Sequence, residues 1–286
     1  MGNARQILTA AAIGLAWLIS ATDARAAAII KPISYHDGYR VCRGFIAYAP
    51  EAAYDIRPGI LLVHQRLGPG DFEKVRARQL AELGYVVLVP DLYGQTGRPK
   101  NLADADRLVK RLLANRAPLR RNLKTALGEL TKHPLTDPEQ LAAIGIGFGG
   151  TAALELARDG ADLDAVVMFH SPLTSNPPDD AKNIRAKILV LRGARDETVP
   201  DAQVDAFKAE MSAAGVDYRI VDFGGVGADF SIKTLSGDAS FEKTYDAAAD
   251  AGAWRATLEF LAAVFDRRVN VPHPLHPRRD YVPGAR

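Results

Sequence analysis

Short apolar runs alternate along the chain with longer segments in which apolar residues recur at helical spacing. The short runs are typical of strands buried on both faces of a sheet, and we predict strands at residues 59–63, 85–89, 141–145, 165–169, 187–191 and 218–223. Helical spacing predicts helices at 72–83, 103–113, 118–130, 148–158, 204–213 and 245–265. The first helix is expected to be capped by Asp71 and to stop at Gly84. This alternation predicts an α/β fold, in which a twisted, mostly parallel sheet carries helices on both faces.

The first 26 residues have a different pattern. Arg5 precedes an apolar run at 7–19, and the small-residue series Ala24-Arg25-Ala26 follows. A charged start, a short apolar stretch and an A-x-A site are the three parts of a secretory signal peptide. The run is shorter than the ~20 residues of a permanent membrane-spanning helix. We therefore expect a signal peptide at 1–26, a secreted or periplasmic mature protein and no stable membrane anchor. An uncleaved N-terminal anchor is the alternative.

Composition narrows the classes of function. The chain has 286 residues, and its 36 Lys and Arg against 34 Asp and Glu give a net charge of +2. A balance so close to zero provides no basic surface for nucleic acid, so no such partner is expected. Cys42 is the one cysteine, which excludes an intrachain disulfide and a multi-cysteine metal site. Residues 27–268 contain no linker and are expected to form one domain, whereas four prolines at 269–286 predict an extended tail.

A glycine-rich turn at 145–150 joins a predicted strand to a predicted helix. Its first, third and sixth residues match the G-x-G-x-x-G pattern of dinucleotide sites. The next strand should then end in an acidic residue for the ribose, but it ends in Phe169-His170-Ser171, which disfavours a dinucleotide. The turn also has the spacing of a nucleophile elbow, with Gly147 where a Ser or Cys would attack the substrate. A packing turn without chemistry is the third interpretation.

Several segments together resemble the dienelactone hydrolase family of α/β hydrolases, and the resemblance covers nearly all of residues 35–265. The segments that carry it are 61–68, 77–85, 90–94, 144–151, 169–170, 193–200 and 223–230. The resemblance implies the α/β-hydrolase fold and an ancestral activity on small esters or lactones. Members of the family use a Cys or Ser nucleophile, a His and an Asp. We expect no cofactor and no metal.

The family's catalytic positions are only partly filled in this sequence. The acid falls on Asp196, within the family's G-x-x-D-x-x-V-P pattern. The nucleophile falls on Gly147 and the histidine on Ala228, neither of which can do the chemistry. A glutamate that often follows the strand-end histidine falls on Gln65.

The donors that would stabilise an oxyanion are less affected, because they belong to the backbone. They would be the N–H groups of Phe148 and Arg66, which a change of side chain does not remove. We therefore expect a pocket to persist above Gly147, bordered by Gln65, Arg66, Phe148, His170, Asp196 and Ala228.

Other residues offer only weak substitutes for the missing pair. None of the six histidines lies between residues 223 and 254, where the family places its base. His64 and His170 end strands near the mouth of the site, where we expect structural roles. Neighbouring residues on a strand point to opposite faces, which argues against a dyad of His170 and Ser171. Asp196, joined by Asp229, could bind a cation or polarise a water, although a loop carboxylate is the simpler interpretation of Asp229.

These patterns favour a secreted family member that binds a small molecule and whose hydrolysis of esters or lactones is impaired. An active hydrolase with relocated catalytic groups is the alternative, so the sequence does not decide whether the chain is an enzyme. A dinucleotide-binding protein is the least favoured interpretation.

Overall fold

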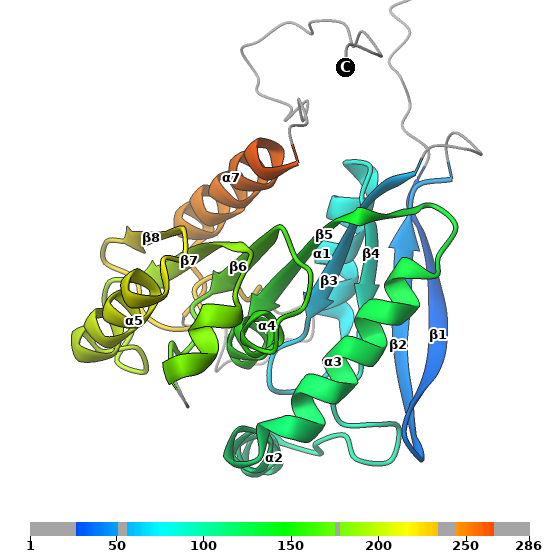
Figure 1. Ribbon diagram of the computed structural model, residues 1–286, viewed down its shortest axis with the longest axis horizontal. Coiled ribbons are helices and arrows are strands. Elements are labelled where there is room, and N and C mark those ends of the chain that lie inside the picture. The colour runs from blue at the N-terminus through cyan, green and yellow to red at the C-terminus, as the bar shows by residue number, and fades with distance from the viewer. Residues whose placement is uncertain (1–26, 51–55, 175–177, 234–243, 266–286) are drawn as a thin grey trace, which may run out of the picture.

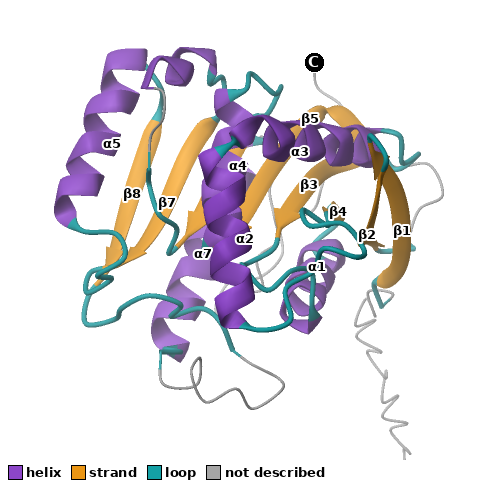
Figure 2. Cartoon of the chain, turned by 90° about the horizontal axis from the view of Figure 1, so that it is seen from below, coloured by secondary structure: helices purple, strands orange, loops and turns teal. Residues whose placement is uncertain are grey.

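The computed structural model describes residues 27–50, 56–174, 178–233 and 244–265, and a mixed sheet forms its centre (Figure 1). The sheet has eight strands in the order β1-β2-β4-β3-β5-β6-β7-β8. Figure 2 shows them side by side, from β8 at one edge to β1 at the other. The strands are β1 Ile29–Asp37, β2 Arg40–Tyr48, β3 Arg57–Val63, β4 Val86–Val89, β5 Thr136–Ile146, β6 Ala165–Phe169, β7 Lys187–Gly193 and β8 Tyr218–Phe223.

The direction of the strands determines where a ligand can bind. The strands from β4 to β8 in the sheet order pair in parallel, whereas β1 pairs with β2 and β2 with β4 in antiparallel register. The carboxyl ends of the parallel strands therefore meet at one edge of the sheet. Open α/β sheets bind their ligands at this edge.

Helices cover both faces of the sheet, as the sequence predicts, and each layer has its own apolar core. Leu123, Leu154 and Phe207 belong to the core on one face, and Leu80 and Leu261 to the core on the other. In Figure 1, α7 lies above strands β6 to β8 and α5 lies below them. The helices are α1 Asp71–Glu82, α2 Leu102–Ala114, α3 Arg116–Thr131, α4 Phe148–Arg158, α5 Asp201–Ala214 and α7 Ala247–Val264, with a 3₁₀ turn at Pro178–Asn183. The fold is the α/β fold expected from the sequence.

The predicted elements differ from the structure mainly at their ends. Asp71 lies inside the first turn of α1, and Gly70 is the N-cap, so the predicted cap is wrong by one residue. The reason is Glu73, whose carboxylate accepts the N–H of Gly70 at 2.9 Å, as the third residue of a capping box does. β1 and β2 are absent from the elements predicted from the sequence. β1 has no continuous apolar run, because it lies at the edge of the sheet. Its exposed residues are Lys31, Pro32, Ser34 and His36.

The expected signal peptide at 1–26 and the expected tail at 269–286 lie outside the described residues. Within the part of the chain that the structure describes, no helix combines the length and the apolar character needed to cross a membrane.

A buried ion cluster fixes the end of α4, the helix whose other end begins at Phe148. Arg158 is fully buried, and its guanidinium donates to Glu210 at 2.7 and 3.0 Å and to Glu155 at 2.9 Å. Glu155 also accepts from Arg116 and Arg120, both at 2.6 Å. The cluster therefore ties α4 to α3 and α5 without leaving a buried charge unpaired.

We predict that Arg158→Met lowers the free energy of unfolding by about 3–5 kcal/mol, because it leaves Glu210 as an unpaired buried carboxylate. Equilibrium unfolding in urea measures this loss. The double replacement Arg158→Met with Glu210→Met should regain much of it, since apolar pairs can replace buried ion pairs at small cost.

Lys132→Met is the matched control, because Lys132 pairs with Glu129 at the surface and its side chain is 72% exposed. It should change the unfolding free energy by less than about 1 kcal/mol. If Arg158→Met costs no more than this control, the cluster does not hold α4.

Candidate functional site

The turn between β5 and α4 is the centre of the site. Gly147 has φ 55° and ψ −119°, so the chain turns sharply there from strand into helix. Its N–H donates to the carbonyl of Phe169 at 2.9 Å, and its own carbonyl accepts from Gly150 at 3.0 Å. A Cβ added to Gly147 would meet only the Nδ1 atom of His170, at 4.0 Å. The turn thus has the sharp form of a nucleophile elbow, with open space where the nucleophile would project.

The other glycines of the turn are explained by close packing. A Cβ on Gly149 would overlap the carbonyl oxygens of Val63 and His64, and one on Gly145 would overlap the backbone of Gly149. A Cβ on Gly150 would overlap the side chain of Ser171. Strand and helix therefore approach so closely that no side chain fits between them.

The carboxylate of Asp196 follows β7 and is buried, with 4% of the residue exposed. Its Oδ1 accepts from the backbone N–H and the hydroxyl of Thr198, at 2.9 and 2.6 Å. Its Oδ2 is also buried and has no donor among the described residues. Buried carboxylate oxygens are normally hydrogen-bonded, so this oxygen fits a site that has lost a donor.

His170 lies between the turn and the loop that follows β8. Its Nε2 pairs with the hydroxyl of Ser231 at 2.9 Å, and its Nδ1 has no hydrogen-bond partner among the described residues. The Oδ1 of Asp229 lies 3.5 Å from that Nδ1. Burial lowers the pKa of His170 to about 4, so the imidazole is neutral at pH 7. His170 and Asp229 both have positive φ, 36° and 57°, which non-glycine residues adopt mainly where surrounding structure enforces it.

The loop after β3 supplies Gln65 and Arg66. The N–H of Gln65 donates to Glu73 at 3.2 Å, and its side-chain oxygen accepts from the N–H of Leu67 at 2.9 Å. Burial raises the pKa of Glu73 to about 7. These bonds fix the backbone on both sides of Arg66, whose own N–H is an expected oxyanion donor. The second expected donor, Phe148, is the first residue of α4, where N–H groups lack acceptors within the helix.

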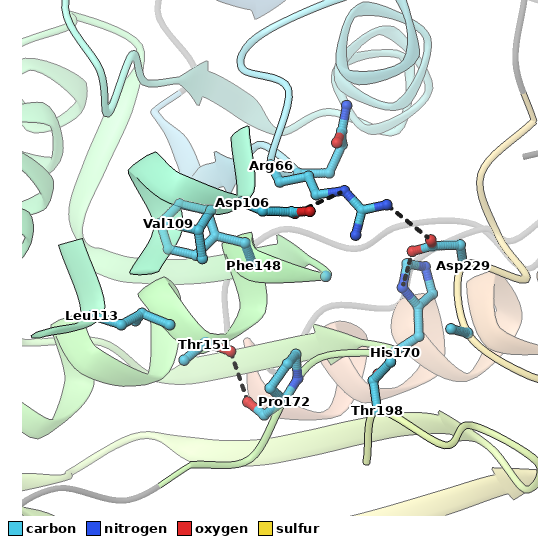
Figure 3. A pocket seen from close by; sticks show the side chains of 13 residues that line it. Arg66, Asp106, Val109, Leu113, Phe148, Thr151, His170, Pro172, Thr198 and Asp229 are labelled. Atoms are coloured by element: carbon cyan, nitrogen blue, oxygen red, sulfur yellow. Dashed lines mark hydrogen bonds and ion pairs between the residues drawn. The ribbon is translucent and has the colours of Figure 1, made fainter. Parts of the chain in front are cut away.

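The guanidinium of Arg66 lies between two carboxylates. Asp106 of α2 is 3.8 Å from its Nε, and Asp229 is 4.0 Å from its Nη2 (Figure 3). Burial raises the pKa of Asp229, and the positive charge of Arg66 opposes that rise.

A cavity of about 230 Å³ collects most of these groups. It is lined by Gln65, Arg66, Asp106, Val109, Leu113, Gly147, Phe148, Thr151, His170, Pro172, Thr198, Ala228 and Asp229. The sequence-predicted residues Gln65, Arg66, Gly147, Phe148, His170 and Ala228 are thus brought together around one space. Asp196 is the exception, because it is buried and does not line the cavity.

Sequence reasoning missed one wall of the cavity. Asp106, Val109 and Leu113 come from α2, and Thr198 comes from the loop after β7. The three helical residues are spaced by three and four positions, so they share one face of α2. That spacing is the one sequence signal that these three residues lie together, and it does not show that their face of α2 borders the cavity.

Other reactive side chains lie in structural roles. The hydroxyl of Ser171 donates to the carbonyl of Phe169 at 2.8 Å, not to His170. Cys42 is buried beside Asn122, whose amide donates to its sulfur at 3.2 Å. Among the described residues, no group of three or more His, Cys, Asp or Glu side chains has the arrangement of a metal site.

Comparisons with known proteins agree with this geometry. The family model described as the dienelactone hydrolase family matches residues 43–265. The structure is similar to a crystal structure of a dienelactone hydrolase-like promiscuous phosphotriesterase from metagenomic libraries, with a TM-score of 0.78, 32% identity, and 84% of this chain and 99% of that chain covered.

Two curated proteins are also similar in sequence. An uncharacterized protein of Caenorhabditis elegans is 35% identical over 150 residues, which cover 51% of this chain and 94% of the relative. A candidate carboxymethylenebutenolidase of Escherichia coli (strain K12) is 25% identical over 214 residues, with 71% and 76% covered. The family match extends from β2 to the last described residue, and the chain belongs to the dienelactone hydrolase family, in the α/β-hydrolase superfamily.

Proposed function

We propose that this protein is an exported member of the dienelactone hydrolase family that binds a small molecule, of the size of an ester or lactone, without covalent hydrolysis. The observation that carries the proposal is Gly147. It keeps the φ and ψ of a nucleophile elbow and borders an open cavity, but it has no side chain to attack a substrate.

The chemistry of acyl transfer explains why the lost groups matter. Attack by Ser or Cys needs a base to take the proton, an acid to orient that base, and donors for the oxyanion. Here the acid position, Asp196, and the backbone donors are present, while Gly147 and Ala228 replace the two groups that make and break bonds. The remaining donors can also donate to the carbonyl oxygen of a ligand that does not react. The retained parts therefore support binding rather than turnover.

We predict that Gly147→Cys together with Ala228→His restores hydrolysis of p-nitrophenyl acetate, at a rate about 10²-fold or more above that of the wild-type protein. The imidazole, held by Asp196, takes the thiol proton, and the thiolate attacks the carbonyl carbon, so that the C–O bond breaks and p-nitrophenolate leaves. Water, whose proton the imidazole takes, then hydrolyses the acetyl thioester and releases acetate and the thiol. A side chain at φ 55° costs about 1–3 kcal/mol, so a lower melting temperature is expected with unchanged circular dichroism.

Ala228→His alone is the control for this experiment, because it adds the base without the nucleophile. It should hydrolyse the ester no faster than the wild-type protein. A folded double variant at the background rate would contradict the proposal. Fast ester hydrolysis by the wild-type protein, abolished by Asp196→Asn, would also contradict the proposal. It would show that a nucleophile and a base lie elsewhere than at positions 147 and 228.

Direct hydrolysis by water is a second candidate function, and the unpartnered Nδ1 of His170 favours it. When Nε2–H donates to Ser231, Nδ1 is free to accept, and it faces the space above Gly147. A water there would attack a bound carbonyl while Nδ1 takes its proton, which then passes to the leaving oxygen. No covalent intermediate with the protein forms in this route.

For this route we predict a slow hydrolysis that His170→Gln reduces by about 10²-fold. Because the neutral imidazole is the base and burial lowers its pKa to about 4, the rate should rise through pH 4 and stay level at higher pH. His36→Gln, a change at an exposed histidine, should leave the rate unaltered. Equal rates in the His170→Gln and wild-type proteins would exclude the route.

Export is the remaining part of the proposal, and the charged start, the apolar run at 7–19 and the Ala24-Arg25-Ala26 series support it. We predict that protein recovered from the periplasm or medium begins at Ala27, as N-terminal sequencing would show. Ala26→Leu should block cleavage, because the peptidase requires a small residue there. A recovered chain that still begins at Met1 would contradict export by cleavage.

A further inference from the structure

The charges around the cavity are unbalanced. Among the described residues, Arg66 is the one cationic side chain that lines it, and Asp106 and Asp229 are its carboxylates. His170 is neutral at pH 7, because burial lowers its pKa to about 4. The lining therefore carries one positive and two negative charges, and the positive one lies between the two carboxylates. Neither carboxylate is within hydrogen-bond distance of Arg66, whose buried Nε has no hydrogen-bond partner among the described residues, but an anionic ligand that bound there would be repelled by both carboxylates.

Two polar atoms converge on one point of the cavity wall. The Nδ1 of His170 is buried without a hydrogen-bond partner among the described residues, and the Oδ1 of Asp229 lies 3.5 Å from it. Figure 3 shows the two side chains facing each other beside Arg66. In the tautomer in which Nε2–H donates to Ser231, the Nδ1 of His170 and the Oδ1 of Asp229 both accept, and a ligand N–H bound between them would select this tautomer. This arrangement is complementary to an N–H donor, and most strongly to a charged one.

The wall opposite Asp229 and His170 is apolar. Val109 and Leu113 of α2 and Phe148 of α4 form it (Figure 3), and Pro172 adds a further apolar surface to the lining. A ligand that satisfies both walls has a small apolar body and a cationic nitrogen at one end.

We propose that the cavity binds a small organic cation, an amine or amidine with a flat apolar body, whose N–H groups donate to Asp229 and to His170. This inference rests on the proposed binding function and adds the chemical class of the ligand. Asp229 is the residue that determines the preference for positive charge.

Three probes of nearly equal shape test the preference: benzamidine, which is cationic, benzamide, which is neutral, and benzoate, which is anionic. Calorimetric titration of the wild-type protein should give an affinity for benzamidine about 10-fold or more above that for benzoate, with benzamide between them. Asp229→Asn should lower the affinity for benzamidine by about 10-fold and leave that for benzamide nearly unchanged. Asn also tolerates the positive φ at this position, so the variant is expected to fold.

Asp162→Asn is the matched control, because Asp162 is an exposed carboxylate whose side chain is 87% accessible and does not line the cavity. It should leave all three affinities unchanged. The cation site would be overturned if benzoate bound as tightly as benzamidine, or if Asp229→Asn kept the preference for benzamidine. Either result would leave the proposed binding function intact. If none of the three probes binds, the binding function itself is wrong, and this inference with it.

Discussion

The close approach of β5 and α4 is the constraint on which the site depends. Side chains at Gly145 and Gly149 would overlap backbone atoms across the turn, so the strand enters the helix through a path that glycine alone allows. That path gives Gly147 its φ of 55° and directs its missing side chain toward the cavity. It also places the N-terminus of α4, with its free N–H groups, at the carboxyl edge of the sheet. The buried cluster around Arg158 fixes the other end of the same helix.

Unsatisfied buried atoms show how the site differs from a working triad. Asp196 keeps one oxygen bonded to Thr198 and leaves the other without a donor, next to a loop that carries Ala228 instead of a histidine. His170, which lines the cavity, has a ring nitrogen without a hydrogen-bond partner among the described residues. Such atoms lower stability unless a ligand or water satisfies them. The orphaned Nδ1 of His170 on the cavity, together with the open space above Gly147, is the physical reason for assigning a binding role to a protein without the catalytic pair.

Much of the fold, but less of the site, could be predicted from the sequence. The continuous apolar runs of β3 and β6 and the helix at 148–158 are local patterns, and the structure confirms them. The sequence places Gly147 at the elbow, but only the backbone angles show that the strained conformation persists. The contact of His170 with Ser231 joins residues that are 61 positions apart, and Asp106 of α2 lies beside Arg66 of the loop after β3. No local pattern encodes such contacts, because they depend on how the helices pack on the sheet.

The elbow at Gly147 keeps its backbone conformation but has no side chain that can act as a covalent nucleophile. Intact-protein mass spectrometry after exposure to a fluorophosphonate, and separately to iodoacetamide, tests this directly. We expect no adduct with either reagent in the folded protein, because Gly147 cannot react and the thiol of Cys42 is buried. Stoichiometric labelling of a serine or cysteine in the folded protein would show that a nucleophile is present, and would contradict the account.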